Sequence, residues 1–151
     1  MSLFHHWDTR VMWADADAAG ILWFGVFFRY FENAEEDLFR RLGRERTTML
    51  HELGIYMPRT SLQSRFRSPA KLGDDVSIGI GVADMSDRRI GYVFDVHERG
   101  TGRLICEASY RVACVDAATF APRTFPAAIV QLLQPARTAT PHPPAPHGTR
   151  E

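Results

Sequence analysis

The sequence predicts an α+β domain in which an antiparallel β-sheet wraps around one long helix. Apolar residues recur with a helical period over residues 24–42 and alternate with other residues after Pro58. Turns rich in glycine and aspartate separate the alternating runs, which is typical of strands joined by short connections. With 151 residues, the chain has the size of one domain with a sizeable core. A sheet accompanied by one long aromatic helix buries most apolar surface when it wraps around that helix.

The predicted central helix spans residues 24–42. Its apolar side chains share one stripe, formed by Phe27, Phe31, Ala34, Leu38 and Leu42. Gly43 follows at a position where a glycine commonly ends a helix. Residues 8–14 are expected to form a short strand before this helix, and residues 46–53 a second short helix that ends at Gly54.

Four strands are expected after the helices, at the alternating runs of residues 60–66, 76–82, 90–96 and 104–114. Because their links are short, consecutive strands are predicted to pair as antiparallel hairpins. Residues 126–133 are expected to add a terminal helix turn. From Pro135 onward, five prolines fall within 17 residues. The predicted domain therefore covers residues 1–134, and residues 135–151 are expected to form a disordered tail.

The composition argues against several classes of function. Eighteen basic and eighteen acidic residues cancel, so no global field attracts nucleic acid or a membrane surface. Neither a signal-peptide pattern nor an apolar run of about 18 residues occurs, which predicts a soluble, cytoplasmic protein. Cys106 and Cys114 are expected in the core, about 26 Å apart along one strand and too far for a disulfide. The six histidines form no metal-binding pattern, so no metal site is predicted.

Two aspartates mark the junction between the first strand and the central helix. Asp15 and Asp17 are suited to a turn or to a helix cap, roles in which aspartate is common. A calcium loop is excluded because Ala19 and Val26 stand where ligands are needed. A carboxylate beside the free N–H groups of a helix N-terminus is also suited to acyl transfer, as a nucleophile or as a general base.

Two sequence blocks carry a resemblance to a known family. They are Val11-Met-Trp-Ala-Asp15-Ala-Asp17-Ala-Ala-Gly20-Ile-Leu-Trp-Phe24 and Phe66-Arg-Ser-Pro-Ala-Lys-Leu-Gly-Asp74. Together they resemble the 4-hydroxybenzoyl-CoA thioesterase family, over residues 8–116. The resemblance implies a hotdog fold and a homodimer or homotetramer with active sites at subunit interfaces. It also implies hydrolysis of an acyl-CoA to free acid and coenzyme A, with no cofactor.

The resemblance further implies roles for residues around the start of the central helix. Asp17 matches the family's catalytic carboxylate, and Gly20 matches the glycine at which the chain turns into the helix. The backbone N–H of Phe24 matches the donor that polarises the thioester carbonyl. Trp23, Phe24 and Phe27 are placed in the acyl pocket, although aromatic residues at this spacing also form cores.

Charged residues outside this loop have two interpretations each. Glu32 matches the acid that recognises the ring substituent in the hydroxybenzoyl branch, and it also suits a solvated or ion-paired helix position. Arg88 and Arg89 match basic residues that bind coenzyme A phosphates in the aroyl-CoA branch, and they also suit a solvated turn. The histidine and tyrosine that many relatives carry at the helix start are missing. This favours an aroyl substrate over a short- or medium-chain acyl substrate.

Three alternatives stay open at this point. A second hotdog lineage carries its acid in the middle of the central helix, where Glu35 or Glu36 stands, but its His-Gly-Gly lead-in is missing. The second alternative is a substrate thioester carried by an acyl carrier protein rather than by coenzyme A. The third is a non-catalytic acyl-binding protein in which Asp17 only caps the helix.

Overall fold

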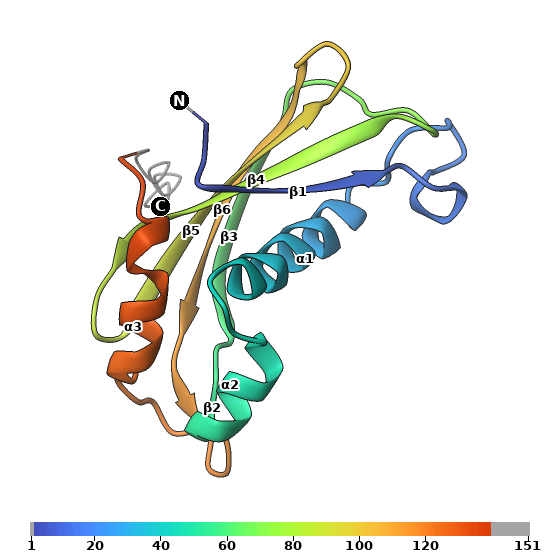
Figure 1. Cartoon of the computed structure of the whole chain (residues 1–151). Coiled ribbons are helices and arrows are strands. Elements are labelled where there is room, and N and C mark those ends of the chain that lie inside the picture. Colours follow the sequence, from blue (N-terminus) through green and yellow to red (C-terminus); the bar gives the residue numbers. More distant parts are fainter. Residues whose placement is uncertain (1, 140–151) are drawn as a thin grey trace, which may run out of the picture.

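The computed structural model describes residues 2–139, with a five-stranded sheet, a two-stranded ribbon and three α-helices (Figure 1). The strands are β1 (His5–Arg10), β2 (Ile55–Tyr56), β3 (Arg59–Phe66), β4 (Asp75–Met85), β5 (Arg89–Glu98), β6 (Leu104–Ala113) and β7 (Val115–Asp116). The helices are α1 (Val26–Arg41), α2 (Arg46–Leu53) and α3 (Ala127–Leu133), with 3-10 turns η1 (Trp13–Asp15) and η2 (Gln134–Ala136).

The main sheet has the strand order β1-β4-β5-β6-β3, and every neighbouring pair is antiparallel. It curves around α1, which lies along its concave face (Figure 1). The core between them is formed by alternate strand residues, including Ile78, Ile80, Tyr92 and Phe94, and by the apolar stripe of α1. The predicted arrangement of a sheet wrapped around one long helix is therefore confirmed.

The central helix is slightly shorter than predicted. It begins at Val26 rather than at residue 24 and ends at Arg41 rather than at residue 42. Its stripe is buried up to Leu38, whereas Leu42, just past its end, is half-buried. Phe31 stacks on Phe94 of β5 with ring centroids 4.7 Å apart. Gly43 has the positive φ of a helix-ending glycine, +96°. The packing of α1 fixes which of its residues face the sheet and which face outward.

Two predictions about the strands are wrong. The first strand ends at Arg10 rather than near residue 14, because the chain turns into η1. β3 does not form a hairpin with β4 but pairs with β6 at the opposite edge of the sheet. The connecting segment crosses the end of the sheet, where the Leu22 N–H donates to the Ala70 carbonyl (2.8 Å) and the Leu72 N–H to the Gly20 carbonyl (2.9 Å).

The C-terminal helix turn predicted for residues 126–133 is confirmed as α3. The predicted domain boundary after residue 134 stays a prediction, and past it the chain forms η2. Beyond it, the N–H of Thr138 donates to the carbonyl of Val82 (2.9 Å) at the edge of β4. Residues 140–151 of the predicted tail lie outside the described residues.

The two cysteines behave as predicted, since both are buried and neither forms a disulfide. None of the helices described in residues 2–139 is long and apolar enough to cross a membrane. The prediction that the protein is cytoplasmic stays a prediction.

Candidate active site

Asp17 stands exposed in the loop that joins β1 to α1. Its Oδ1 accepts the backbone N–H groups of Ala19 (2.8 Å) and Ile21 (3.4 Å), and its own N–H donates to the Ile21 carbonyl (2.8 Å). Gly20 has φ +74°, the left-handed conformation that the predicted turn requires. No hydrogen-bond partner for the second oxygen, Oδ2, occurs within residues 2–139. The loop therefore holds the carboxylate through one oxygen and leaves the other free to react.

Asp15 has the opposite environment, because its carboxylate is buried. Oδ2 accepts the N–H of Met12 (3.0 Å) and the hydroxyl of Tyr30 (3.0 Å), and Oδ1 accepts a guanidinium N–H of Arg29. Burial, together with the Asp15 carboxylate, raises the pKa of Tyr30 well above its usual value, so this phenol stays protonated and donates. Asp15 thus ties the loop to α1.

The start of α1 offers unpaired N–H groups close to this loop. Within the described chain, the N–H groups of Phe24 and Gly25 have no acceptor, and no side chain caps the helix. The Trp23 ring lies over Gly25, where an added Cβ would be 2.3 Å from a ring carbon. Trp23 itself is fixed through its N–H, which donates to the Asp15 carbonyl (2.9 Å). Free N–H groups at a helix N-terminus stabilise a developing negative charge on a carbonyl oxygen.

The aromatic residues predicted for the acyl pocket divide into two groups. Trp23 and Phe24 are half-exposed and contact each other, with ring centroids 5.1 Å apart. Phe27 is buried and packs on Phe66 of β3 (5.2 Å) and on Phe31 (6.5 Å). In a single chain, Phe27 therefore belongs to the core, which is the alternative interpretation of its spacing.

A charged cluster lies further along α1. Glu35 is buried, and its Oε2 accepts hydrogen bonds from Arg59 (2.7 Å), Arg46 (3.1 Å) and the Tyr110 hydroxyl (2.5 Å). Glu32, half-exposed one turn earlier, pairs with the same arginines at 3.1 and 3.5 Å. Burial and the Glu35 charge raise the pKa of Tyr110 well above its usual value, so its hydroxyl remains a donor.

Glu32 and Glu35 were singled out from the sequence, but the arginines that bind them were not. Strict alternation along β3 places Arg59 with Ser61, on the side facing away from α1. The register of β3 shifts between these two residues, and Arg59 lies opposite Val112, whose side chain is in the core. Such an irregularity turns a side chain to the other face of a sheet, and here it directs Arg59 toward Glu35.

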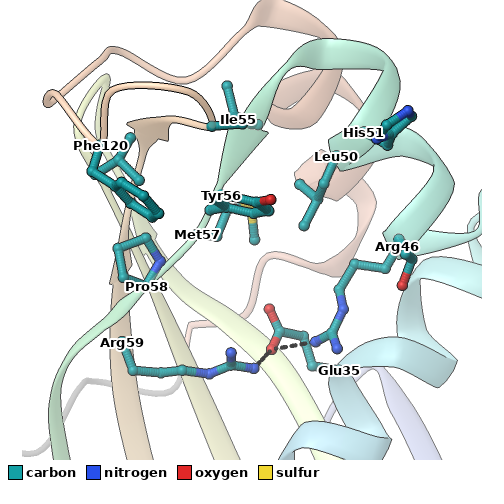
Figure 2. Close-up of a pocket in the computed structure, with 13 residues that line it drawn as sticks. Glu35, Arg46, Leu50, His51, Ile55, Tyr56, Met57, Pro58, Arg59 and Phe120 are labelled. Atoms are coloured by element: carbon teal, nitrogen blue, oxygen red, sulfur yellow. Dashed lines mark hydrogen bonds and ion pairs between the residues drawn. The ribbon is translucent and has the colours of Figure 1, made fainter.

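A cavity of about 760 Å³ opens above the cluster, between α2, the β2–β7 ribbon and the start of β3 (Figure 2). Its walls are mostly apolar, formed by Leu50, Ile55, Tyr56, Met57, Pro58, Val115 and Phe120 among others. Its floor is Glu35 with Arg46 and Arg59 (Figure 2). The cavity has the size and lining common in small-molecule sites.

Arg88 and Arg89 lie where β4 turns into β5. In one chain they are at the opposite end of β4 from the Asp17 loop, about 33 Å away by the length of the strand. Neither guanidinium has an acidic partner among residues 2–139. The structure therefore does not bring them to Asp17 of the same chain.

A model of the thioesterase-like superfamily matches residues 11–133. The chain belongs to this superfamily. A 1,4-dihydroxy-2-naphthoyl-CoA hydrolase of Thermosynechococcus vestitus is 29% identical over 65% of this chain and 67% of that protein. An acyl-CoA thioesterase, YbgC, of Haemophilus influenzae is 26% identical over 78% of this chain and 85% of that protein.

Solved structures confirm the hotdog fold. A 1,4-dihydroxy-2-naphthoyl-CoA thioesterase from Synechocystis has a TM-score of 0.78 at 18% identity, over 85% of this chain and 94% of that one. A gentisyl-coenzyme A thioesterase has a TM-score of 0.75 at 21% identity, over 85% and 99%. Family and fold together identify the chain as a hydrolase of the thioesterase class. The narrower assignment to the 4-hydroxybenzoyl-CoA thioesterase family stays a prediction.

Proposed function

We propose that the protein hydrolyses an acyl-CoA thioester, with Asp17 as the reacting carboxylate and the Phe24 N–H as the oxyanion donor. The observation that carries this proposal is the free Asp17 oxygen, held by a tight loop beside an uncapped helix N-terminus. The relatives named acyl-CoA thioesterases, which align over most of the chain, support the reaction class. No cofactor is needed for this chemistry.

In the reaction, the thioester carbonyl oxygen accepts the N–H of Phe24, which stabilises the negative charge as the carbonyl carbon is attacked. Asp17 either attacks that carbon itself or removes a proton from the water that attacks it. The C–S bond then breaks, the sulfur of coenzyme A leaves and takes up a proton, and the acyl group becomes the free acid. If Asp17 attacks first, water hydrolyses the resulting anhydride.

The complete site requires a second copy of the chain. β3 is an edge strand, and its residues Leu62 and Phe66, which face α1, remain 40% and 51% exposed. Phe28 on α1 is exposed as well, at 41%. An unpaired strand edge beside exposed apolar side chains is a typical dimer surface. Two β3 edges paired about a two-fold axis give a homodimer with α1 helices side by side, and a homotetramer is expected from two such dimers.

The acyl group of the proposed substrate is an aroyl group. Trp23 and Phe24 offer half-exposed aromatic surface beside Asp17, and three of the similar proteins are named for aromatic acyl-CoA substrates. Glu32 is proposed to recognise a ring substituent from the partner subunit. Arg88 and Arg89, which are exposed and unpaired among the described residues, are proposed to bind coenzyme A phosphates of a neighbouring subunit's substrate.

The experiment is a hydrolysis assay on benzoyl-, hydroxybenzoyl-, phenylacetyl-, hexanoyl- and acetyl-CoA. Asp17→Asn should lower kcat by about a hundredfold or more on every substrate that the parent hydrolyses. Asp8→Asn, an exposed aspartate on β1, is the matched control and should leave the rate unchanged. If Asp17→Asn is as active as the control, Asp17 is not the catalyst. If the parent hydrolyses no acyl-CoA, the substrate is a carrier-protein thioester or the protein only binds acyl groups.

A further inference from the structure

The Glu35 cavity and the Asp17 loop lie at opposite ends of α1 in one chain. The Asp17 loop precedes the first turn of the helix, whereas Glu35 is in its third turn. The cavity therefore cannot serve the carboxylate of its own chain directly.

In a dimer paired through β3, the Asp17 loop of one subunit and the Glu35 cavity of the other come close together. Phe66, at one end of β3, contacts Phe27 in the first turn of α1, next to the Asp17 loop. Arg59, at the other end of β3, lines the cavity. An antiparallel pairing sets the Phe66 end of one strand against the Arg59 end of the other. The Asp17 loop of one subunit then adjoins the Glu35 cavity of its partner.

We propose, on the basis of the function proposed above, that the Glu35 cavity of one subunit holds the far end of the acyl group whose thioester reacts at the partner's Asp17. Residues Leu50, Arg59 and Glu35 are then specificity determinants that act across the dimer interface. None of them touches the reacting atoms.

The chemistry of the cavity defines which acyl group fits. The formal charges of Glu32, Glu35, Arg46 and Arg59 cancel, so the floor favours a neutral group over an ion. All three donors to Glu35 bind its Oε2. The other carboxylate oxygen is turned toward the cavity (Figure 2), and the buried Tyr92 hydroxyl also lies close to the Glu35 carboxylate. Arg59 retains N–H groups beside it.

An acyl group with an apolar body and a hydroxyl or amide at its far end can hydrogen-bond with both Glu35 and Arg59. Its N–H or O–H donates to Glu35, and its oxygen accepts from Arg59. The apolar walls cover the body of the acyl group. At the rim, Tyr56 and Phe120 stack with ring centroids 5.9 Å apart, and both are at least half-exposed. Phe120 has φ +60°, a strained conformation for an aromatic residue that holds its ring over the cavity.

The first test fills the cavity and compares acyl lengths. Leu50→Trp should lower the ratio of kcat/KM for hexanoyl-CoA to that for acetyl-CoA by about tenfold or more, because only the longer chain reaches the cavity. Thr48→Trp, on α2 but outside the cavity, is the matched control and should leave the ratio unchanged. A ratio that Leu50→Trp does not move, or a parent that hydrolyses aroyl-CoA but not hexanoyl-CoA, overturns the inference and leaves the proposed function intact.

The second test asks whether the cavity acts on the partner's site. Equal amounts of Asp17→Asn and Leu50→Trp subunits are allowed to exchange, and dimer formation is checked by light scattering. Mixed dimers contain one intact Asp17 facing one intact cavity, so about a quarter of the parental hexanoyl-CoA activity should appear. If the cavity served its own subunit, the mixture would show no gain over the two variants measured apart. That result also overturns the inference.

The third test concerns charge. The parent should prefer 6-hydroxyhexanoyl-CoA to hexanoyl-CoA, and hexanoyl-CoA to adipyl-CoA, whose acyl group ends in a carboxylate. Glu35→Gln makes the floor formally positive and should shift kcat/KM toward adipyl-CoA by about tenfold relative to 6-hydroxyhexanoyl-CoA. Circular dichroism and thermal melting verify that the variant is folded. If it does not fold, Arg59→Gln, which makes the floor negative, should disfavour adipyl-CoA further. A ratio of kcat/KM for adipyl-CoA to that for 6-hydroxyhexanoyl-CoA that the folded variant does not change contradicts the proposed acyl chemistry.

Discussion

Asp15→Ala should destabilise the protein far more than Asp17→Ala, although the two aspartates are separated by one residue. In Asp15→Ala, the buried Tyr30 hydroxyl loses its acceptor, which costs about 1–3 kcal/mol. The Met12 N–H loses its acceptor as well, for about 1 kcal/mol. The pair with Arg29 adds little because the Arg29 side chain is 59% exposed. The sum is about 2–4 kcal/mol, or a fall in melting temperature of roughly 5–15 °C.

The assay is urea unfolding followed by circular dichroism, with thermal melting as a second measurement. Asp17→Ala loses only hydrogen bonds in an exposed loop, so its unfolding free energy should fall by less than about 1 kcal/mol. Tyr30→Phe removes the phenol that Asp15 accepts from. In the double variant with Asp15→Ala, the two effects should overlap by about 1 kcal/mol or more, because both remove the same hydrogen bond.

Equal destabilisation by the two alanine variants would refute this reasoning, as would full additivity of Asp15→Ala and Tyr30→Phe. Either result would mean that the Asp15 contacts do not hold the loop on α1. The expected result, by contrast, separates a structural aspartate from a chemical one. Activity measured on the same proteins should be lost in Asp17→Ala while its stability is nearly unchanged.

Two further predictions concern other titratable groups. Burial, with a contribution from Glu107, raises the pKa of Cys106 to about 12, and burial also raises the pKa of Cys114. Neither thiol of the native protein should therefore react with Ellman's reagent at pH 8, whereas both should react in guanidinium chloride. Burial raises the pKa of Asp95 above its usual 3.8, so the stability that this carboxyl contributes when protonated is lost as the pH rises through the raised pKa. Asp95→Asn should therefore stabilise the protein more at pH 7.5 than at pH 4, measured by urea unfolding.

The periodicity of the sequence predicted the helices and strands closely, because each presents one apolar face to a shared core. The boundaries of α2 were predicted to the residue, and α1 differed by two residues at its start and one at its end. Periodicity carries no information about which strands are neighbours, so the crossing of the chain between β3 and β4 was missed. The β2–β7 ribbon was missed because each of its strands has only two residues.

The candidate site was predicted in part, and the missed part has a physical reason. Asp17, Gly20 and the start of α1 are close in sequence, so one motif contains them all. The partners of Glu35 come from α2, β3 and β6, which only the folded chain brings together. The register shift at Arg59 reverses the face that simple alternation predicts for it. A site assembled across elements by such an irregularity leaves no local pattern to recognise.

The hydrogen bonds around Glu35 also help to decide whether Glu35 or Asp17 is the catalytic carboxylate. Glu35 was the alternative catalyst, but Arg46, Arg59 and Tyr110 all donate to one of its oxygens. These three donors hold the bound oxygen of Glu35 in an ion-paired, hydrogen-bonded cluster, which occupies it instead of leaving it free to attack a thioester. Asp17 accepts only backbone N–H groups, through one oxygen, and stands beside unpaired N–H groups that can hold an oxyanion. The Glu35 cluster is therefore suited to recognising an acyl group, and the Asp17 loop to hydrolysing it.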